Sequence, residues 1–267
     1  IAFSAGMPHF NWTLMSKYMN QKTMVITGGN RGIGLDITEA YVKAGYFVVV
    51  GARQELGLGS RFGDQVRFIA TDVRDESAHR RLVDAAIEKT GTLDVYINNA
   101  GFSEWRPIGE IDEKFLDDLI GTNLKGAFWG CKAASSAMQG GGCIINISSI
   151  AGKRGSSNNS AYCASKFGMN GLTQALAKEL GPLGIRVNAL CPVLVPTDGL
   201  LEALKNSFSP AKGDPKGFIA NFTTANAALG RLPTGAEIAA MSLFLTSDAA
   251  SAMTGQCINV DCGVFPQ

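Results

Sequence analysis

The sequence predicts a single α/β domain built on a doubly wound, mostly parallel sheet of seven strands with helices on both faces. Short apolar runs rich in Val and Ile alternate along the chain with longer stretches of helical period, and this alternation implies right-handed strand–helix–strand crossovers. The apolar runs are continuous, as in parallel strands that are covered on both faces. No linker-like composition interrupts the pattern, so we expect one domain over 21–267.

Seven strands and five longer helices are expected. The strands are the runs TMVIT, YFVVVGA, VRFIA, DVYIN, CIINIS, IRVNAL and QCINV, at 23–27, 46–52, 66–70, 94–98, 143–148, 185–190 and 256–260. The helices are the stretches of helical period between them, near 32–44, 75–90, 112–138, 160–181 and 235–246.

One stretch, at about 197–229, breaks this rhythm. Its centre, SFSPAKGDPKGF, carries two Pro and two Gly, and we expect a short helical piece on each side of it. A long insertion after the carboxyl end of a strand is a typical place for a substrate lid, which is the interpretation we adopt over an ordinary surface loop.

Composition and charge exclude several classes of partner. Apolar residues make up 46% of the 267 residues and charged residues 18%, which suits a well-formed core. The net charge is +1 with no basic or acidic block, so neither nucleic acid nor a membrane surface is an expected partner. No apolar run approaches the ~18 residues that a membrane helix needs.

The N-terminus and the cysteines bear on processing and location. Residues 1–20 lack the charged and apolar regions of a signal peptide, and we expect them to be a leader or an added extension. The six Cys contain no C-x-x-C pair, which suits reduced thiols in a cytoplasmic protein. His9 and His79 are isolated, so no metal site is expected.

A strand, a Gly-rich turn and a helix follow one another in MVITGGNRGIG. Gly28, Gly32 and Gly34 permit a tight turn and let a pyrophosphate approach backbone N–H groups, while the helix beginning near Gly32 offers its positive end. Because the motif opens the first βα unit of an alternating chain, it predicts a dinucleotide site that includes Asn30 and Ile33.

The end of the second strand indicates which dinucleotide binds. Enzymes that use NAD usually place Asp or Glu there to hold the ribose hydroxyls, but this chain has Ala52 followed by Arg53. Arg31, inside the Gly-rich turn, adds a second cation. Two guanidinium groups suit a 2′-phosphate, so NADP(H) is favoured over NAD(H); two solvated arginines would leave the missing acid unexplained.

Further motifs follow in order: TDV at 71–73, NNAG at 98–101, TNLKG at 122–126, ISS at 147–149, YCASK at 162–166 and CPVLVPT at 191–197. Together with the Gly-rich turn they resemble the short-chain dehydrogenase/reductase family of the T-G-x-x-x-G-x-G and Y-x-x-x-K type, including 3-oxoacyl reductases and related NADP-dependent alcohol dehydrogenases. The resemblance extends from about residue 23 to 263. It implies an oxidoreductase that interconverts a ketone and a secondary alcohol.

The resemblance implies four catalytic residues. Tyr162 would be the general acid or base, although a free phenol has a pKa of about 10. Lys166, one helical turn later, would lower that pKa and hold the nicotinamide ribose. Ser149 would hydrogen-bond the substrate oxygen, with Ser148 as the alternative, and Asn123 would hold a proton-relay water.

The resemblance also extends the cofactor site. It implies that Asp72 and Val73 lie at the adenine, and Val195 and Thr197 at the carboxamide. Val193 replaces a Gly of the family pattern. The full predicted cofactor set is Gly28, Asn30, Arg31, Gly32, Ile33, Gly34, Arg53, Asp72, Val73, Asn99, Ala100, Gly101, Tyr162, Lys166, Pro192, Val195 and Thr197.

The sequence says less about the substrate. The segment at 135–142 carries no Lys or Arg for an acidic carrier protein, although Lys153 and Arg154 lie nearby. The polar and aromatic residues at 103–106 instead favour a small polar substrate, namely a hydroxyacid, polyol or sugar-like alcohol. The alternatives are 3-oxoacyl-[acyl carrier protein] reduction and a non-catalytic NADP(H)-binding sensor or scaffold. The resemblance further implies a homodimer or homotetramer.

Overall fold

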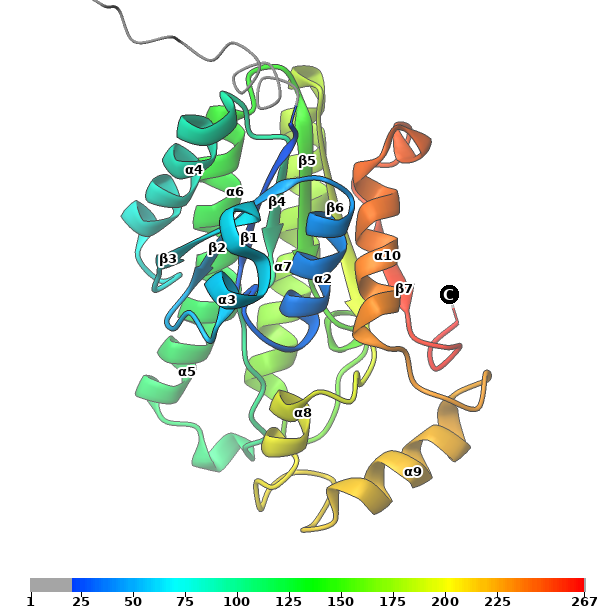
Figure 1. Ribbon diagram of the computed structural model, residues 1–267. Coiled ribbons are helices and arrows are strands. Elements are labelled where there is room, and N and C mark those ends of the chain that lie inside the picture. Colours follow the sequence, from blue (N-terminus) through cyan, green and yellow to red (C-terminus); the bar gives the residue numbers. More distant parts are fainter. Residues whose placement is uncertain (1–20, 267) are drawn as a thin grey trace, which may run out of the picture.

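The sheet lies between two layers of helices in the computed structural model, which describes residues 21–266 (Figure 1). The expected extension at 1–20 lies outside these residues. All neighbouring strands pair in parallel, in the order β3-β2-β1-β4-β5-β6-β7, which confirms the predicted fold. The strands are β1 (Thr23–Thr27), β2 (Phe47–Ala52), β3 (Val66–Ala70), β4 (Val95–Asn98), β5 (Gly142–Ile147), β6 (Ile185–Pro192) and β7 (Cys257–Val260).

Two apolar clusters attach the helices to the two faces of the sheet. On one face, helices α2 (Gly32–Lys43) and α10 (Gly235–Thr246) pack against the strands through Ile37, Tyr41 and Ile238. The short helix α3 (Leu58–Phe62), which the sequence did not predict, packs on the same face. On the other face Leu82, Ala134 and Leu180 come from α4 (Glu76–Thr90), α6 (Gly126–Ala137) and α7 (Ser160–Leu180). Both faces are therefore covered, as the continuous apolar strands predict.

The helix expected over 112–138 is divided. It consists of α5 (Glu113–Ile120), a π-turn (Gly121–Lys125) and α6. Within the turn, the side chain of Asn123 bonds both backbone groups of Phe102. A single turn of π-helix inside an α-helix is a common feature of functional sites.

Two helices occupy the insertion at 197–229, as expected: α8 (Asp198–Ala203) and α9 (Pro215–Asn226). Both lie beyond the carboxyl ends of the strands, where the crevice of an open α/β sheet is found (Figure 1). Short 3₁₀ segments cover Gly63–Gln65, Ile108–Glu110, Ile150–Gly152, Gly181–Leu183 and Asp248–Ala250.

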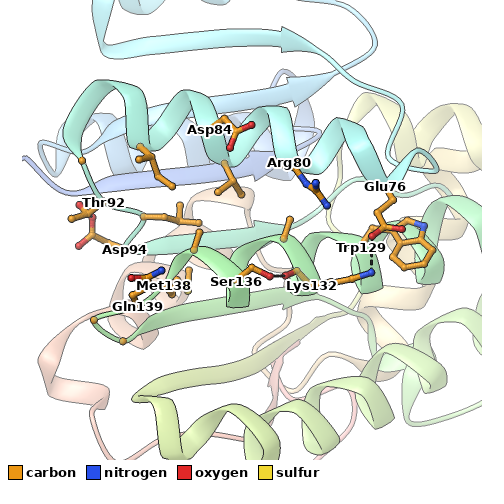
Figure 2. Close-up of a pocket in the computed structure, with 18 residues that line it drawn as sticks. Glu76, Arg80, Asp84, Thr92, Asp94, Trp129, Lys132, Ser136, Met138 and Gln139 are labelled. Atoms are coloured by element: carbon orange, nitrogen blue, oxygen red, sulfur yellow. Dashed lines mark hydrogen bonds and ion pairs between the residues drawn. The ribbon is translucent and has the colours of Figure 1, made fainter.

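A groove of about 630 Å³ runs between α4 and α6 (Figure 2). The ion pair of Glu76 with Lys132 (2.7 Å) crosses it at one end. Asp94 and Gly141, just before β4 and β5, line the other end. The groove therefore opens toward the amino-terminal ends of these strands, and none of the predicted site residues lines it.

The described residues also limit other roles. None of the helices within 21–266 combines the length and apolar character that crossing a membrane requires. Over the same range, no three His, Cys, Asp or Glu side chains are grouped so that they could bind a metal ion.

Candidate active site

The Gly-rich turn is tied to the segment that follows β4. The side-chain amide of Asn99 donates to the carbonyl oxygens of Thr27 and Gly28, each at 3.0 Å. The hydroxyl of Thr27, which sequence reasoning did not single out, accepts from the backbone N–H groups of Asn99 and Ala100. A Cβ atom on Gly34 would lie 2.1 Å from the carbonyl oxygen of Gly28, so the turn closes only with glycine there.

The turn and the amino end of α2 suit an anionic group. Arg31 occupies the N-cap of α2 without a side-chain cap, and the first turn of the helix holds no acid. The N–H groups there are thus free of a side-chain cap, which is the arrangement that binds phosphates. Asn30 donates to the carbonyl oxygen of Gln54 at 2.7 Å and so holds the loop of Arg31 near that of Arg53. Both arginines are exposed, and neither is in a salt bridge with another residue of 21–266.

The segment after β6 closes the other side of this crevice. A Cβ atom on Gly32 would lie 3.5 Å from a methyl carbon of Thr197, so the two loops are in van der Waals reach. Thr197 caps α8 by accepting from the N–H of Leu200 at 3.3 Å, and its own N–H donates to the carbonyl of the buried Val195. The Gly-rich turn and the segment after β6 therefore lie next to each other.

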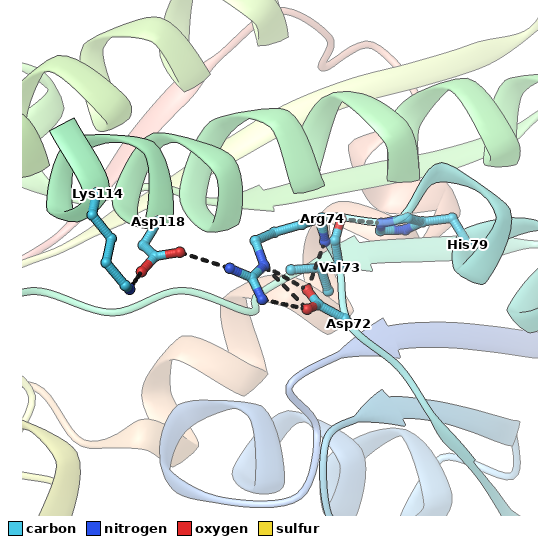
Figure 3. A network of polar contacts seen from close by, with 6 residues as sticks. All are labelled: Asp72, Val73, Arg74, His79, Lys114 and Asp118. Atoms are coloured by element: carbon cyan, nitrogen blue, oxygen red, sulfur yellow. Dashed lines mark hydrogen bonds and ion pairs between the residues drawn. The ribbon is translucent and has the colours of Figure 1, made fainter.

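Asp72 belongs to a polar network that sequence reasoning missed (Figure 3). Its carboxylate accepts from the guanidinium of Arg74 at 2.6–3.1 Å, and these bonds lower the pKa of Asp72. Arg74 also bonds Asp118 of α5 at 2.7 Å. The backbone oxygen of Val73 accepts from His79 at 2.9 Å, where burial keeps the pKa of His79 below its usual value. The acidic residues on both sides of Arg74 are the signal that sequence reasoning could have used.

Three of the predicted catalytic side chains lie together at the carboxyl end of β5 and the start of α7. Burial raises the pKa of the Tyr162 phenol to about 12, and the nearby hydroxyl of Ser149 acts in the opposite direction and lowers it. The ammonium of Lys166 lies 5.7 Å from the centre of the Tyr162 ring and donates to the carbonyl of Ile147 at 2.7 Å. Burial lowers the pKa of Lys166 to about 8.

The two neighbouring serines differ in what they contact. Ser148 is buried and donates to the carbonyl of Lys166 at 3.3 Å. Ser149 donates to the carbonyl of Pro192 at 3.5 Å and accepts from the N–H of Ala151. Because successive residues of an extended chain point to opposite sides, Ser149 and not Ser148 is brought to the phenol.

Asn123 approaches the same site from the π-turn. Its side chain accepts from the N–H of Phe102 at 3.0 Å, and donates to the carbonyl of Phe102 at 2.8 Å and the hydroxyl of Ser165 at 3.3 Å. This side chain is fully engaged. A Cβ atom on Gly101 would lie 3.0 Å from its Oδ1, so the NNAG segment passes directly over Asn123.

The sequence and the fold are similar to those of known oxidoreductases. A family model described as enoyl-(acyl carrier protein) reductase matches residues 28–265. The chain is 35% identical to the 3-oxoacyl-[acyl-carrier-protein] reductase FabG of Chlamydia muridarum, over 94% of this chain and 100% of the relative. It is 34% identical to L-2,3-butanediol dehydrogenase of Corynebacterium glutamicum, over 91% of this chain and 98% of the relative.

A crystal structure of a variant actinorhodin polyketide ketoreductase with NADPH superposes with a TM-score of 0.85 at 33% identity, covering 92% of this chain and 98% of that one. These matches span nearly the whole chain and agree with the parallel sheet and the ordered motifs. The chain therefore belongs to the short-chain dehydrogenase/reductase family, as an oxidoreductase that acts on CH–OH and C=O groups.

Proposed function

We propose that the protein is an NADP(H)-dependent oxidoreductase that interconverts a ketone and a secondary alcohol on a small, free substrate. The gathering of Tyr162, Ser149 and Lys166 at the junction of β5 and α7, with the Lys166 ammonium 5.7 Å from the centre of the Tyr162 ring, is the observation that carries this proposal. A phenol that is held protonated beside a hydroxyl can donate to a carbonyl oxygen.

The Gly-rich turn and the neighbouring segment after β6 would hold the cofactor. The uncapped N–H groups of α2 would receive its phosphates, and Lys166 would hold the nicotinamide ribose. When bound, the cofactor supplies or accepts the hydride.

The proton follows the side chains. In ketone reduction Tyr162 donates its phenolic proton to the carbonyl oxygen, to which Ser149 also donates a hydrogen bond; in alcohol oxidation Tyr162 takes the proton back. The positive charge of Lys166 favours the phenolate. Since the side chain of Asn123 is engaged with Phe102 and Ser165, a relay water at this residue would bind the backbone of the π-turn.

The preference for NADP(H) rests on Arg31 and Arg53. We expect the double variant Arg31→Ala/Arg53→Ala to lose NADPH affinity while NADH affinity changes little, measured by cofactor fluorescence titration. Arg67→Ala, an exposed arginine at the opposite end of β3, is the control. A wild-type protein that binds NADH more tightly than NADPH would contradict the assignment.

Two substrate classes are worth separating. The names of FabG and of the family model favour a carrier-bound acyl substrate, whereas butanediol dehydrogenase acts on a free diol. We favour the free substrate, since Arg154, a cation that could meet an acidic carrier, stacks on Phe265 at 5.1 Å. Turnover of small ketones, compared with an acyl-carrier thioester at equal concentration, tests this.

The polarity of the substrate needs a separate argument. The preference for a hydroxyacid, polyol or sugar-like alcohol rests on the residues after β4. Of these, Glu104 and Arg106 pair with each other at 2.8 Å, and Trp105 is buried. Glu104 and Arg106 therefore offer a polar substrate fewer free groups than the sequence pattern implies.

Assembly and location complete the proposal. Leu116, Phe128 and Phe167, on α5, α6 and α7, are large exposed apolar side chains, which supports a homodimer or homotetramer formed through these helices. Light scattering on the purified protein tests this, and a monomer at all concentrations would contradict it. All six cysteines are free thiols, which supports a cytoplasmic location.

A further inference from the structure

Helix α9, the longer helix of the 197–229 insertion, has one apolar side that remains only half-buried. Phe218, Ile219 and Phe222 are partly buried along it, and the rings of Phe218 and Phe222 lie 5.9 Å apart. Asn221 and Thr224, on the other side, are exposed. An amphipathic helix whose apolar side chains are not fully covered has room there for another apolar group.

Two small apolar clusters attach α9 to the rest of the protein. The first is formed by Trp105, Leu204 and Ala211, and contacts Phe218 and Ile219. The second cluster is formed by Val193, Ala227, Leu232 and Val264, and Ile150, Leu194, Ile219 and Phe222 pack against it. Because Ile219 contacts both clusters, the apolar side of α9 connects them.

The second cluster adjoins the catalytic serine. Ile150, which packs against it, is the residue after Ser149. Val193, a buried member, follows Pro192, whose carbonyl accepts from the Ser149 hydroxyl at 3.5 Å. The apolar side of α9 and the group that would bind the substrate oxygen are therefore connected through a single layer of apolar side chains.

Several polar side chains on and near α9 already have partners or face solvent. The hydroxyl of Thr223 donates to the carbonyl of Ile219 at 2.7 Å. Lys205 pairs with Glu202 at 2.7 Å, and the only charged residue of α9, Lys216, is exposed. Hydroxyl groups of a polyol placed against this side of α9 would lose water without gaining partners, which is unfavourable.

We propose that the substrate carries an apolar group, aliphatic or aryl, next to its carbonyl carbon, and that Phe222 and Ile219 of α9 determine specificity by packing against this group. The inference rests on the proposed function, because it assigns the substrate of the same site. It replaces the polyol-like substrate with a small apolar ketone or the corresponding secondary alcohol.

The experiment compares ketones of similar size in NADPH oxidation. Cyclohexanone and acetophenone are the apolar probes, and dihydroxyacetone and erythrulose are the hydroxylated ones. We expect kcat/KM to be at least about tenfold higher for the apolar probes, the range that apolar packing in a pocket supplies. Phe222→Ala should lower kcat/KM for the apolar probes about tenfold or more, chiefly by raising KM. It should leave kcat/KM for erythrulose unchanged.

Two further variants keep the result interpretable. Asn221→Ala, on the exposed side of the same helix, should change kcat/KM for each ketone by no more than about twofold. Phe222→Leu should retain most of the preference for the apolar ketones. The apolar assignment would be overturned if the wild-type protein prefers erythrulose, or if Phe222→Ala lowers kcat/KM equally for all four ketones. The assignment of the protein as an oxidoreductase would remain intact in both cases. NADPH binding without turnover of any ketone would overturn both.

Discussion

Replacing Gly34 by Ala should open the Gly-rich turn. The new Cβ atom would lie 2.1 Å from the carbonyl oxygen of Gly28, whereas real Cβ atoms approach other atoms no closer than about 3 Å. The turn must therefore widen by about 1 Å. That shift breaks the 3.0 Å bond from Asn99 to Gly28, at a cost of about 0.5–1.5 kcal/mol, and overpacking adds about 1–3 kcal/mol. We expect a loss of about 1.5–4.5 kcal/mol in the free energy of unfolding.

The assay combines urea unfolding with NADPH titration, since the widened turn also displaces the N–H groups that receive phosphate. The matched control is Gly181→Ala, at the end of α7, where the backbone is right-handed helical and a Cβ atom would meet nothing within 4 Å. Wild-type stability together with wild-type NADPH affinity in Gly34→Ala would show that the turn is not closed by this contact.

Two other substitutions test the chemistry and the polar network. Tyr162→Phe should lower kcat about 10²–10⁴-fold with little change in NADPH affinity. Alcohol oxidation needs the phenolate, and burial raises the pKa of Tyr162 to about 12, so the wild-type oxidation rate should increase with rising pH. The residual rate of Tyr162→Phe should not depend on pH in this way. If the pH profiles of the two proteins are parallel, the assignment of Tyr162 is refuted. Arg74→Met removes the partner of Asp72 and Asp118. Since exposed ion pairs contribute little, we expect KM for NADPH to rise less than about tenfold with kcat unchanged, and a large fall in kcat would contradict this.

The sequence predicts the strands and the Gly-rich turn because their causes are local. A run such as FVVVGA is apolar on both faces, so it forms a strand that is buried between two layers of helices, as β2 is. The preference for Ser149 over Ser148 follows from its spacing to Tyr162, which the resemblance to the family implies, and it stays a prediction.

The π-turn and the ion pairs have causes that are distant in sequence. Asn123 is held by the backbone of Phe102, 21 residues away, and Arg74 by Asp118, 44 residues away. The ion pair between Glu104 and Arg106 is close in sequence, but their spacing alone does not tell whether they bind each other or a substrate. The strand pattern alone could not predict the partners of Asn123 and Arg74, because Phe102 and Asp118 belong to other segments of the fold.

The site divides its tasks between rigid and less buried parts of the protein. Ser149, Tyr162 and Lys166 lie at the junction of β5 and α7, where Lys166 is buried and bonded to the carbonyl of Ile147. Helix α9, by contrast, contains no fully buried residue and is attached through two small apolar clusters. Proton transfer depends on fixed geometry, whereas the shape and polarity of the substrate depend on side chains such as Phe222. Substitutions on α9 can therefore change the substrate without disturbing the tyrosine, and this separation is why the chemistry could be inferred from motifs while the substrate required the contacts of the insertion.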